Sequence, residues 1–223
     1  MKLSEISNTG LRFISAALMF VVLAGVICLE YYFPTIHAVR ILAVLIFIGG
    51  IFETLKCFKS ASAETFNKHA IYFIAFIALL VLVTYSAFVV GTRPWIMLWL
   101  LMIIVGADVG AWAFGKTLGG DKMWERISGH KTWSGQIGGI VCGTIMSVIF
   151  FLYFKPFGND AMFATLLGVT VSLLSQYGDL TASFIKRCLN IKDFGNLLPG
   201  HGGILDRFDG WIYVLPFICF FVK

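Results

Sequence analysis

The sequence predicts an all-α polytopic membrane protein with about seven spans and a cytoplasmic N-terminus. Apolar residues make up 59% of the 223-residue chain and charged residues 13%, whereas soluble domains contain about half apolar and about a quarter charged residues. The apolar residues also gather in runs close to the ~20 residues that cross a hydrocarbon core. The basic residues lie unevenly in the connections between these runs. A polytopic membrane protein is therefore favoured over a soluble one.

Seven apolar runs are the expected spans, in chain order: 11–29, 36–53, 69–90, 94–115, 136–154, 160–178 and 211–222. The first follows a short polar start and lacks an Ala-x-Ala cleavage site, so it is expected to be retained rather than cleaved as a signal peptide. The last is short, and either it thins the bilayer locally or its helix begins inside the preceding polar segment. We treat 1–223 as one membrane domain, with N-terminal spans at 1–92 and a motif-bearing half at 93–223.

The basic residues set the expected orientation. With the N-terminus in the cytoplasm, 13 of the 17 Lys and Arg residues fall inside and 4 fall outside, as the positive-inside rule requires. Both long polar loops, 116–135 and 179–210, then face the cytoplasm, where nucleotides are. We expect a protein of the bacterial inner (cytoplasmic) membrane whose site faces the cytoplasm.

A disulfide- or zinc-stabilised protein and a nucleic-acid-binding protein are both disfavoured. The five cysteines contain no CxxC pair and mostly lie in or beside apolar runs, so neither a disulfide nor a zinc framework follows. They are Cys28, Cys57, Cys142, Cys188 and Cys219. The net charge of +5 is spread over loops and forms no basic domain. No nucleic-acid partner is therefore expected.

The chemistry is expected in a polar block, 183–209, with one aspartate just upstream of it. Its four aspartates alternate with four cations: Asp179, Asp193, Asp206 and Asp209 with Lys186, Arg187, Lys192 and Arg207. Carboxylates with few soft ligands nearby suit Mg²⁺, and interleaved cations neutralise phosphates. Three glycines flank the single histidine of the block and would let backbone N–H groups approach a phosphate. A plain positive-inside connector has no reason to combine these features.

Two aspartates of the block and one in the fourth span are candidate metal ligands. Asp206 and Asp209 are spaced i, i+3, and would share one face if 206–211 begins the last helix. Asp108 lies inside the fourth apolar run, where an ionisable residue is costly and is a functional candidate. The alternative is that Asp108 is a buried polar group holding closely packed helices together, since small residues surround it.

One longer pattern runs through the block: Ser183-x-x-Lys186-Arg187, then Lys192-Asp193, then Pro199-Gly200-His201-Gly202-Gly203-x-x-Asp206-Arg207-x-Asp209. It resembles the signature of the phosphatidate cytidylyltransferase family. Gly178-Asp179-Leu180 and 128–139 also resemble family patterns, so the resemblance covers roughly the C-terminal half. The three N-terminal spans carry no motif. The resemblance implies a nucleotidyltransferase that moves a cytidylyl group from CTP to phosphatidate, giving CDP-diacylglycerol and pyrophosphate.

The resemblance also implies residue roles. The catalytic set is Asp179, Lys186, Arg187, Lys192, Asp193, His201, Asp206, Arg207 and Asp209. The substrate-binding set is Lys131, Thr132, Ser183, Gly202 and Gly203. Mg²⁺ would bind at Asp179, Asp206, Asp209 and Asp108, and a second cation is left open. The partners implied are CTP, phosphatidate and membrane lipids, and a homodimer is left open. For His201, phosphate binding or turn structure is favoured over acid–base work, because a phosphate oxygen is already ionised at neutral pH.

The sequence departs from the family pattern at Gly129 and His130 and at two positions where an expected carboxylate is missing. Ser134 and Ala182 stand where the family usually has glutamate, so no carboxylate role carries over to them. Three alternatives stay open. The first is a CTP-dependent transferase for another lipid, an isoprenoid-type phosphate or an alcohol. The second is a cation or proton transporter using Asp108 and Asp179, although no internal repeat typical of transporters is visible. The third is an inactive relative that acts as a binding partner.

Overall fold

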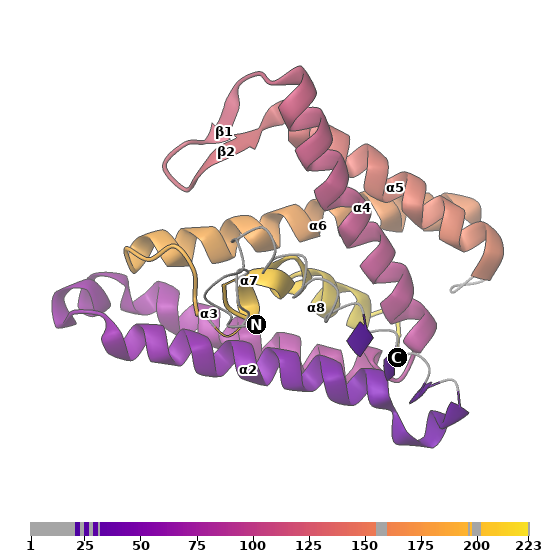
Figure 1. The fold of residues 1–223 in the computed structure, drawn as a ribbon, viewed down its shortest axis with the longest axis horizontal. Helices are drawn as coiled ribbons and strands as arrows, with labels where there is room; N and C mark the ends of the chain where they lie inside the picture. Colours follow the sequence, from indigo (N-terminus) through magenta and orange to yellow (C-terminus); the bar gives the residue numbers. More distant parts are fainter. Residues whose placement is uncertain are drawn as a thin grey trace, which may run out of the picture. The chain divides into compact units, whose positions relative to one another are not determined.

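The computed structural model describes residues 21–22, 25–26, 29–30, 32–154, 160–195, 197 and 202–222. Helices dominate it (Figure 1). The α-helices whose bounds fall within the described residues are α2 (Ala38–Ser60), α3 (Ala63–Val90), α4 (Pro94–Leu118), α5 (Trp133–Phe154), α6 (Ala161–Cys188), α7 (Leu205–Phe208) and α8 (Val214–Cys219). The remaining elements are the 3-10 turns η2 (Pro34–Ile36) and η3 (Asp209–Trp211) and the strands β1 (Lys122–Trp124) and β2 (Ser128–Thr132).

Among the described residues, five helical segments are long and apolar enough to cross a membrane: Pro34–Ser60, Ala63–Val90, Pro94–Leu118, Trp133–Phe154 and Ala161–Cys188. They correspond to the second to sixth apolar runs of the sequence, which confirms an all-α polytopic membrane protein. The first predicted run, 11–29, lies mostly outside the described residues. The total of seven spans and the cytoplasmic N-terminus remain predictions.

The last predicted run, 211–222, is not one continuous helix. It contains the end of η3 and the six-residue helix α8, which at about 1.5 Å per residue is far shorter than a hydrocarbon core of about 30 Å. Pro216 lies in the first turn of α8, the part of a helix where its missing N–H is tolerated. A spanning helix over 211–222 is therefore not confirmed.

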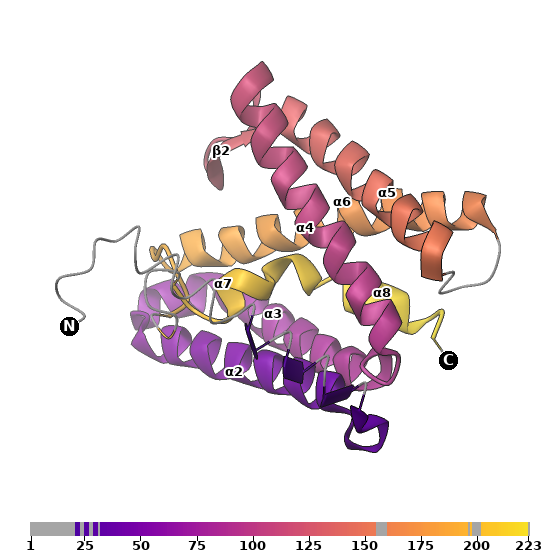
Figure 2. The same cartoon turned by 45° about the vertical axis from the view of Figure 1, so that its right-hand side comes forward.

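The described chain divides into two compact units: residues 1–92 with 185–208, and residues 93–184 with 209–223. In the first unit, α2 and α3 lie side by side (Figures 1 and 2). Ser62 accepts a hydrogen bond from the Thr65 N–H (3.2 Å) and so caps the start of α3. Near this turn the rings of Phe58 and Phe73 stack with their centroids 4.5 Å apart. The cap and the stacked rings fix the turn between the two helices.

In the second unit, α4 packs closely against α5 (Figure 2). The close approach depends on glycines of α5, as small residues permit in membrane helices. A Cβ atom at Gly139 would lie 2.9 Å from the carbonyl oxygen of Ala107 on α4 and 2.8 Å from the side-chain nitrogen of Gln176 on α6. The same face carries a polar contact, since the Trp99 indole N–H donates to the Ser147 hydroxyl (3.2 Å).

We expect Gly139→Val to destabilise the protein because its side chain would overlap the backbone of α4. Overpacked core substitutions typically cost about 1–3 kcal/mol. A fall in the thermal unfolding midpoint of the detergent-purified protein checks this. Val141→Ala is the matched control, since Val141 lies on the same helix and is exposed, and it should leave the midpoint nearly unchanged. Equal midpoints for Gly139→Val and wild type would contradict the packing described.

The segment 116–135, expected to be a loop, contains a short antiparallel hairpin of β1 and β2. Lys122 pairs with Thr132 and Trp124 pairs with Ser128. Helix α4 also continues to Leu118, and the Ser134 hydroxyl donates to the carbonyl oxygen of Gly119, which ends that helix. The hairpin therefore leads directly into α5.

Helix α6 continues well beyond the predicted end of its apolar run at residue 178. It ends at Cys188, so the first part of the predicted loop 179–210 is helical. The reason is that a buried face persists after the hydropathy falls, with Ala182 and Ile185 both buried. Hydropathy thus identified where the apolar run ends, not where the helix ends. The polar residues from 179 to 187 consequently sit on a rigid helix.

Candidate active site

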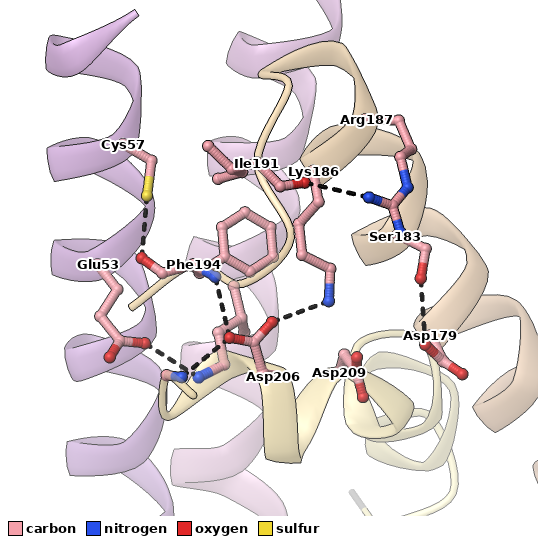
Figure 3. A network of polar contacts seen from close by, with 12 residues as sticks. Glu53, Cys57, Asp179, Ser183, Lys186, Arg187, Ile191, Phe194, Asp206 and Asp209 are labelled. Atoms are coloured by element: carbon pink, nitrogen blue, oxygen red, sulfur yellow. Dashed lines mark hydrogen bonds and ion pairs between the residues drawn. The ribbon is translucent and has the colours of Figure 1, made fainter. Parts of the chain in front are cut away.

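Asp206, in the first unit, is held by three donors from the signature and the loop before it (Figure 3). One carboxylate oxygen accepts a hydrogen bond from the Lys186 ammonium at 2.8 Å. The other accepts the backbone N–H groups of Phe194 and Gly203, both at 2.9 Å. The side chains of Asp206 and Lys186 are only 5% and 10% exposed. Residues from both ends of the signature therefore contact each other in a buried, charge-assisted hydrogen-bond network.

An aromatic wall lines one side of this network. The Lys186 ammonium lies 5.5 Å from the centroid of the Phe194 ring, within range of a cation–π contact. Phe194 in turn stacks on Phe76 of α3, with ring centroids 5.9 Å apart. Water is largely excluded from the ion pair, and breaking such a buried pair typically costs about 3–5 kcal/mol.

Helix α2 supplies partners that the sequence did not reveal. The Glu53 carboxylate accepts the Leu205 N–H at 3.2 Å, and the Cys57 thiol donates to the Phe194 carbonyl at 2.9 Å. A Cβ atom on Gly50 would lie 3.2 Å from the Leu205 side chain. No motif marks this span in the sequence, and Glu53 was not predicted as a site residue. The available signal was a lone carboxylate inside an apolar run, which is costly unless it has a role.

Gly202 and Gly203 of the signature have structural roles. Gly202 has a φ of 86°, a left-handed conformation that glycine adopts without strain. The Gly203 N–H is used by Asp206. The resemblance predicts that Gly203 binds substrate. A phosphate could bind to the Gly203 N–H only by displacing its hydrogen bond to Asp206.

The other charged residues of the block are more accessible. Lys192, Asp193 and Arg207 are exposed. The Arg187 guanidinium, also exposed, donates to the Ile191 carbonyl at 3.4 Å. His201 lies outside the described residues, so its predicted role in phosphate binding or turn structure remains a prediction.

The second unit brings together two predicted residues that are far apart in the sequence. The Lys131 ammonium at the end of the hairpin lies 2.5 Å from the Asp179 carboxylate on α6. The Ser183 hydroxyl, one turn along α6, is 3.4 Å from the same carboxylate. Asp179 and Lys131 are 39% and 26% exposed. Unlike the Asp206 pair, this pair is open to an incoming ligand.

Two further aspartates belong to the second unit. Asp108, on α4, is close enough to Asp179 and Lys131 for both charges to act on its carboxyl group. The Asp209 carboxylate accepts the N–H of Gly210 at 2.9 Å. A Cβ atom on Gly178 would collide with the carbonyl oxygen of Asp209. The absent side chain at Gly178 thus lets the start of η3 lie directly beside Asp179.

The remaining predicted residue and the two departures have structural explanations. The Thr132 hydroxyl accepts the Gly135 N–H at 3.2 Å and so caps the start of α5. Ser134 ends α4 through its bond to Gly119. Ala182 is fully buried. A serine and an alanine at these two positions therefore fit the local packing as it stands.

In the described part of the chain, no group of three or more His, Cys, Asp or Glu side chains is arranged to hold a metal. Mg²⁺ typically uses one or two carboxylates and completes its octahedron with waters and substrate phosphates. Asp179 fits that mode because it is partly exposed. Asp206 would have to exchange its Lys186 contact for the metal.

These features define a polytopic membrane protein with carboxylate–ammonium pairs at the ends of its helices, an arrangement suited to binding phosphate groups. The model of the cytidylyltransferase family matches residues 1–223. The chain belongs to the cytidylyltransferase family. The family expected from the signature is thereby confirmed.

Bacterial relatives named phosphatidate cytidylyltransferase match about half of the chain. The protein of Staphylococcus aureus (strain COL) is 46% identical over 124 residues, which is 55% of this chain and 46% of the relative. That of Bacillus subtilis (strain 168) is 43% identical over 119 residues, 53% and 44% of the two chains. That of Staphylococcus haemolyticus (strain JCSC1435) is 40% identical over 122 residues, 55% and 46%. The matched part therefore spans a little under half the length of these relatives.

Proposed function

We propose that the protein transfers the cytidylyl group of CTP to phosphatidate, forming CDP-diacylglycerol and releasing pyrophosphate. The observation that carries this proposal is that residues predicted for the site form two carboxylate–ammonium pairs, Lys186–Asp206 within the signature and Lys131–Asp179 outside it, in a protein of membrane-spanning helices. Family membership and the names of the relatives support the same reaction. A lipid substrate also explains why the site is built at helix ends, since its head group stays at the interface while its chains remain in the bilayer.

In this reaction a phosphatidate oxygen attacks the α-phosphorus of CTP. A new P–O bond forms as the bond to the bridging oxygen of the β-phosphate breaks, and pyrophosphate leaves with the electron pair. The attacking oxygen is already ionised, so the protein must position the reactants and neutralise charge rather than remove a proton. Lys131 is the best placed cation for this task, because its partner Asp179 is partly exposed and a phosphate can share it. Lys192 and Arg207 are exposed and can receive the remaining phosphate charge.

Mg²⁺ would be held by aspartates of the signature, with Asp179 as the primary ligand. Asp108 and Asp209 are the further candidates of the same unit, and Asp206 is the candidate of the other. When bound, the ion neutralises charge on the reacting phosphates. The contribution of the chain itself is to keep Asp179 beside Lys131 and to hold Asp206 in place through Lys186 and two N–H groups. Whether a second cation binds is left open.

We further propose that the protein lies in the bacterial inner membrane with this site toward the cytoplasm. The 13-to-4 distribution of basic residues in the seven-span arrangement supports the orientation. CTP is a cytoplasmic metabolite, so the same orientation gives the enzyme access to its nucleotide. Cysteine-accessibility labelling of single-cysteine variants in intact cells would test it.

A lipid panel tests the reaction. The purified 223-residue chain in nanodiscs is given CTP, Mg²⁺ and one acceptor at a time: phosphatidate, an isoprenoid phosphate or diacylglycerol. Pyrophosphate release with phosphatidate and not with the other two is expected. Pyrophosphate release only with the isoprenoid phosphate would show that the substrate is that lipid phosphate and not phosphatidate. Cation flux into proteoliposomes without CTP, and no CDP-lipid from folded protein, would favour a transporter.

A further inference from the structure

We propose that Glu53 of α2 is a positioning residue that fixes the segment carrying Asp206. Its effect on catalysis rests on the proposed function, whereas its effect on the structure of the segment does not. Glu53 belongs to an apolar span outside the signature, and neither the motif nor the resemblance assigns it a role. The contacts between Glu53 and this segment lie within the first unit (Figure 3).

The Glu53 carboxylate reaches the backbone directly beside Asp206. Its Oε2 atom accepts the Leu205 N–H at 3.2 Å. Its Oε1 atom is buried and has no hydrogen-bond partner among the described residues. A carboxylate oxygen that loses water without a new donor is costly. An apolar residue at this position would avoid that desolvation cost. The presence of a carboxylate here therefore argues that Glu53 has a specific role.

Two glycines make room for this carboxylate. A Cβ atom at Gly195 would lie 2.5 Å from Oε1, and one at Gly203 would lie 2.7 Å from Oε2. Neither glycine has the positive φ seen at Gly202, so backbone conformation does not demand glycine at either position. The Glu53 carboxylate fills the space that a Cβ atom would need at Gly195, and at Gly203 it does so together with the Gly195 backbone nitrogen, which would lie 2.8 Å from the added Cβ. The carboxylate thus lies between both arms of the loop that donates the Phe194 and Gly203 N–H groups to Asp206.

The neighbouring thiol offers a reporter of this docking. Cys57 lies one turn after Glu53 on α2 and donates to the Phe194 carbonyl at 2.9 Å. If the loop leaves α2, that contact breaks and the thiol becomes more accessible to alkylation. The Glu53 charge also acts on this thiol, so the rate of Cys57 modification is compared after extrapolation to the fully ionised thiol, where it measures loop docking without reference to catalysis.

The experiment compares Glu53→Ala and Glu53→Gln with Glu30→Gln. Glu30 is the matched control, since it is also buried and accepts a backbone N–H, that of Val39 at 3.2 Å. Each purified protein is treated with N-ethylmaleimide, and Cys57 modification is followed by peptide mass spectrometry. Losing a hydrogen bond to a charged acceptor should raise the Cys57 rate about tenfold or more in Glu53→Ala. Glu53→Gln keeps an acceptor and should show a smaller rise, and Glu30→Gln should show none.

Activity gives the second readout. A displaced Asp206 should lower kcat about 10- to 100-fold in Glu53→Ala, as supporting residues of sites commonly do, with KM for CTP changed less than about threefold. Gly195→Ala should be impaired in the same way. Adding Glu53→Asp, which shortens the side chain by one methylene, should restore part of its kcat. This rescue would show that the Glu53 carboxylate and a side chain at position 195 compete for the same space.

The outcomes separate the two proposals. Unchanged Cys57 modification in folded Glu53→Ala, or wild-type kcat in that variant, would overturn the positioning role. If Glu53→Ala fails to fold, the same criteria apply to Glu53→Gln. Faster Cys57 modification together with no CDP-lipid from wild type would support the positioning of the loop while removing the proposed reaction.

Discussion

Asp206→Asn is expected to reduce CDP-diacylglycerol formation about 10³-fold while the protein remains folded. The aspartate accepts three donors, the Lys186 ammonium and two backbone N–H groups. An asparagine presents an NH₂ group to at least one of them and so places donor against donor. It also leaves the Lys186 charge buried without its counterion, which is strongly unfavourable. The loss expected on removing one such preorganised electrostatic group is about 10²–10³-fold, and the mispaired lysine adds to it.

The matched control is Asp160→Asn. Asp160 is exposed and accepts the Phe163 N–H at the start of α6, so it also has a backbone partner but lies outside the signature. Initial rates with CTP and phosphatidate, together with elution as a single species on size exclusion, check both variants. An Asp206→Asn protein with more than about a tenth of wild-type activity would contradict the role assigned to this network.

Asp179→Asn is expected to lower kcat about 10²-fold with little change in stability. Asp179 is 39% exposed and its main partner is Lys131, so its charge is available to Mg²⁺ or to the balance of phosphate charge, and it contributes little to the core. Substitutions at such accessible positions usually change the free energy of unfolding by less than about 0.5 kcal/mol. The Mg²⁺ concentration for half-maximal rate should rise about 10- to 100-fold, the range seen when a metal site is weakened.

Titration of Mg²⁺ at saturating CTP measures this shift. Thr165→Ala is the control, since Thr165 is an exposed residue of the same helix whose hydroxyl donates to the Ala161 carbonyl, and its rate should stay within about threefold of wild type. An Asp179→Asn protein with an unchanged Mg²⁺ dependence would show that Asp179 acts through Lys131 and not through the cation.

Most spans could be predicted from the sequence because hydropathy depends only on local composition. Five apolar runs became five spanning helices. The ends of these helices could not be predicted in the same way, as α6 shows. It continues to Cys188 since its buried face persists into the polar block, where the mean hydropathy has already fallen. The hairpin of β1 and β2 was missed because its strands are short and carry no regular alternation.

The candidate site was predictable where its residues are close in sequence or belong to the family pattern. The family resemblance named both Lys131 and Asp179 as site residues, and the structure places them in contact. Glu53 was not predictable, because its contact to Leu205 joins residues 152 positions apart and no local pattern marks it. The same carboxylate lies beside Gly195 and Gly203, and of these two glycines only Gly203 was predicted to have a role, in substrate binding. Only the packed structure shows that they accommodate a carboxylate.

The fate of the phosphates of CTP tests the central claim most directly. The purified chain is incubated with phosphatidate, Mg²⁺ and CTP carrying a radioactive α-phosphate or, in a parallel reaction, a radioactive γ-phosphate. Cytidylyl transfer predicts that the α-label enters the lipid fraction as CDP-diacylglycerol and that the γ-label is released as pyrophosphate. Transfer of the γ-label to lipid, or no lipid label in either reaction with folded protein, would contradict the account.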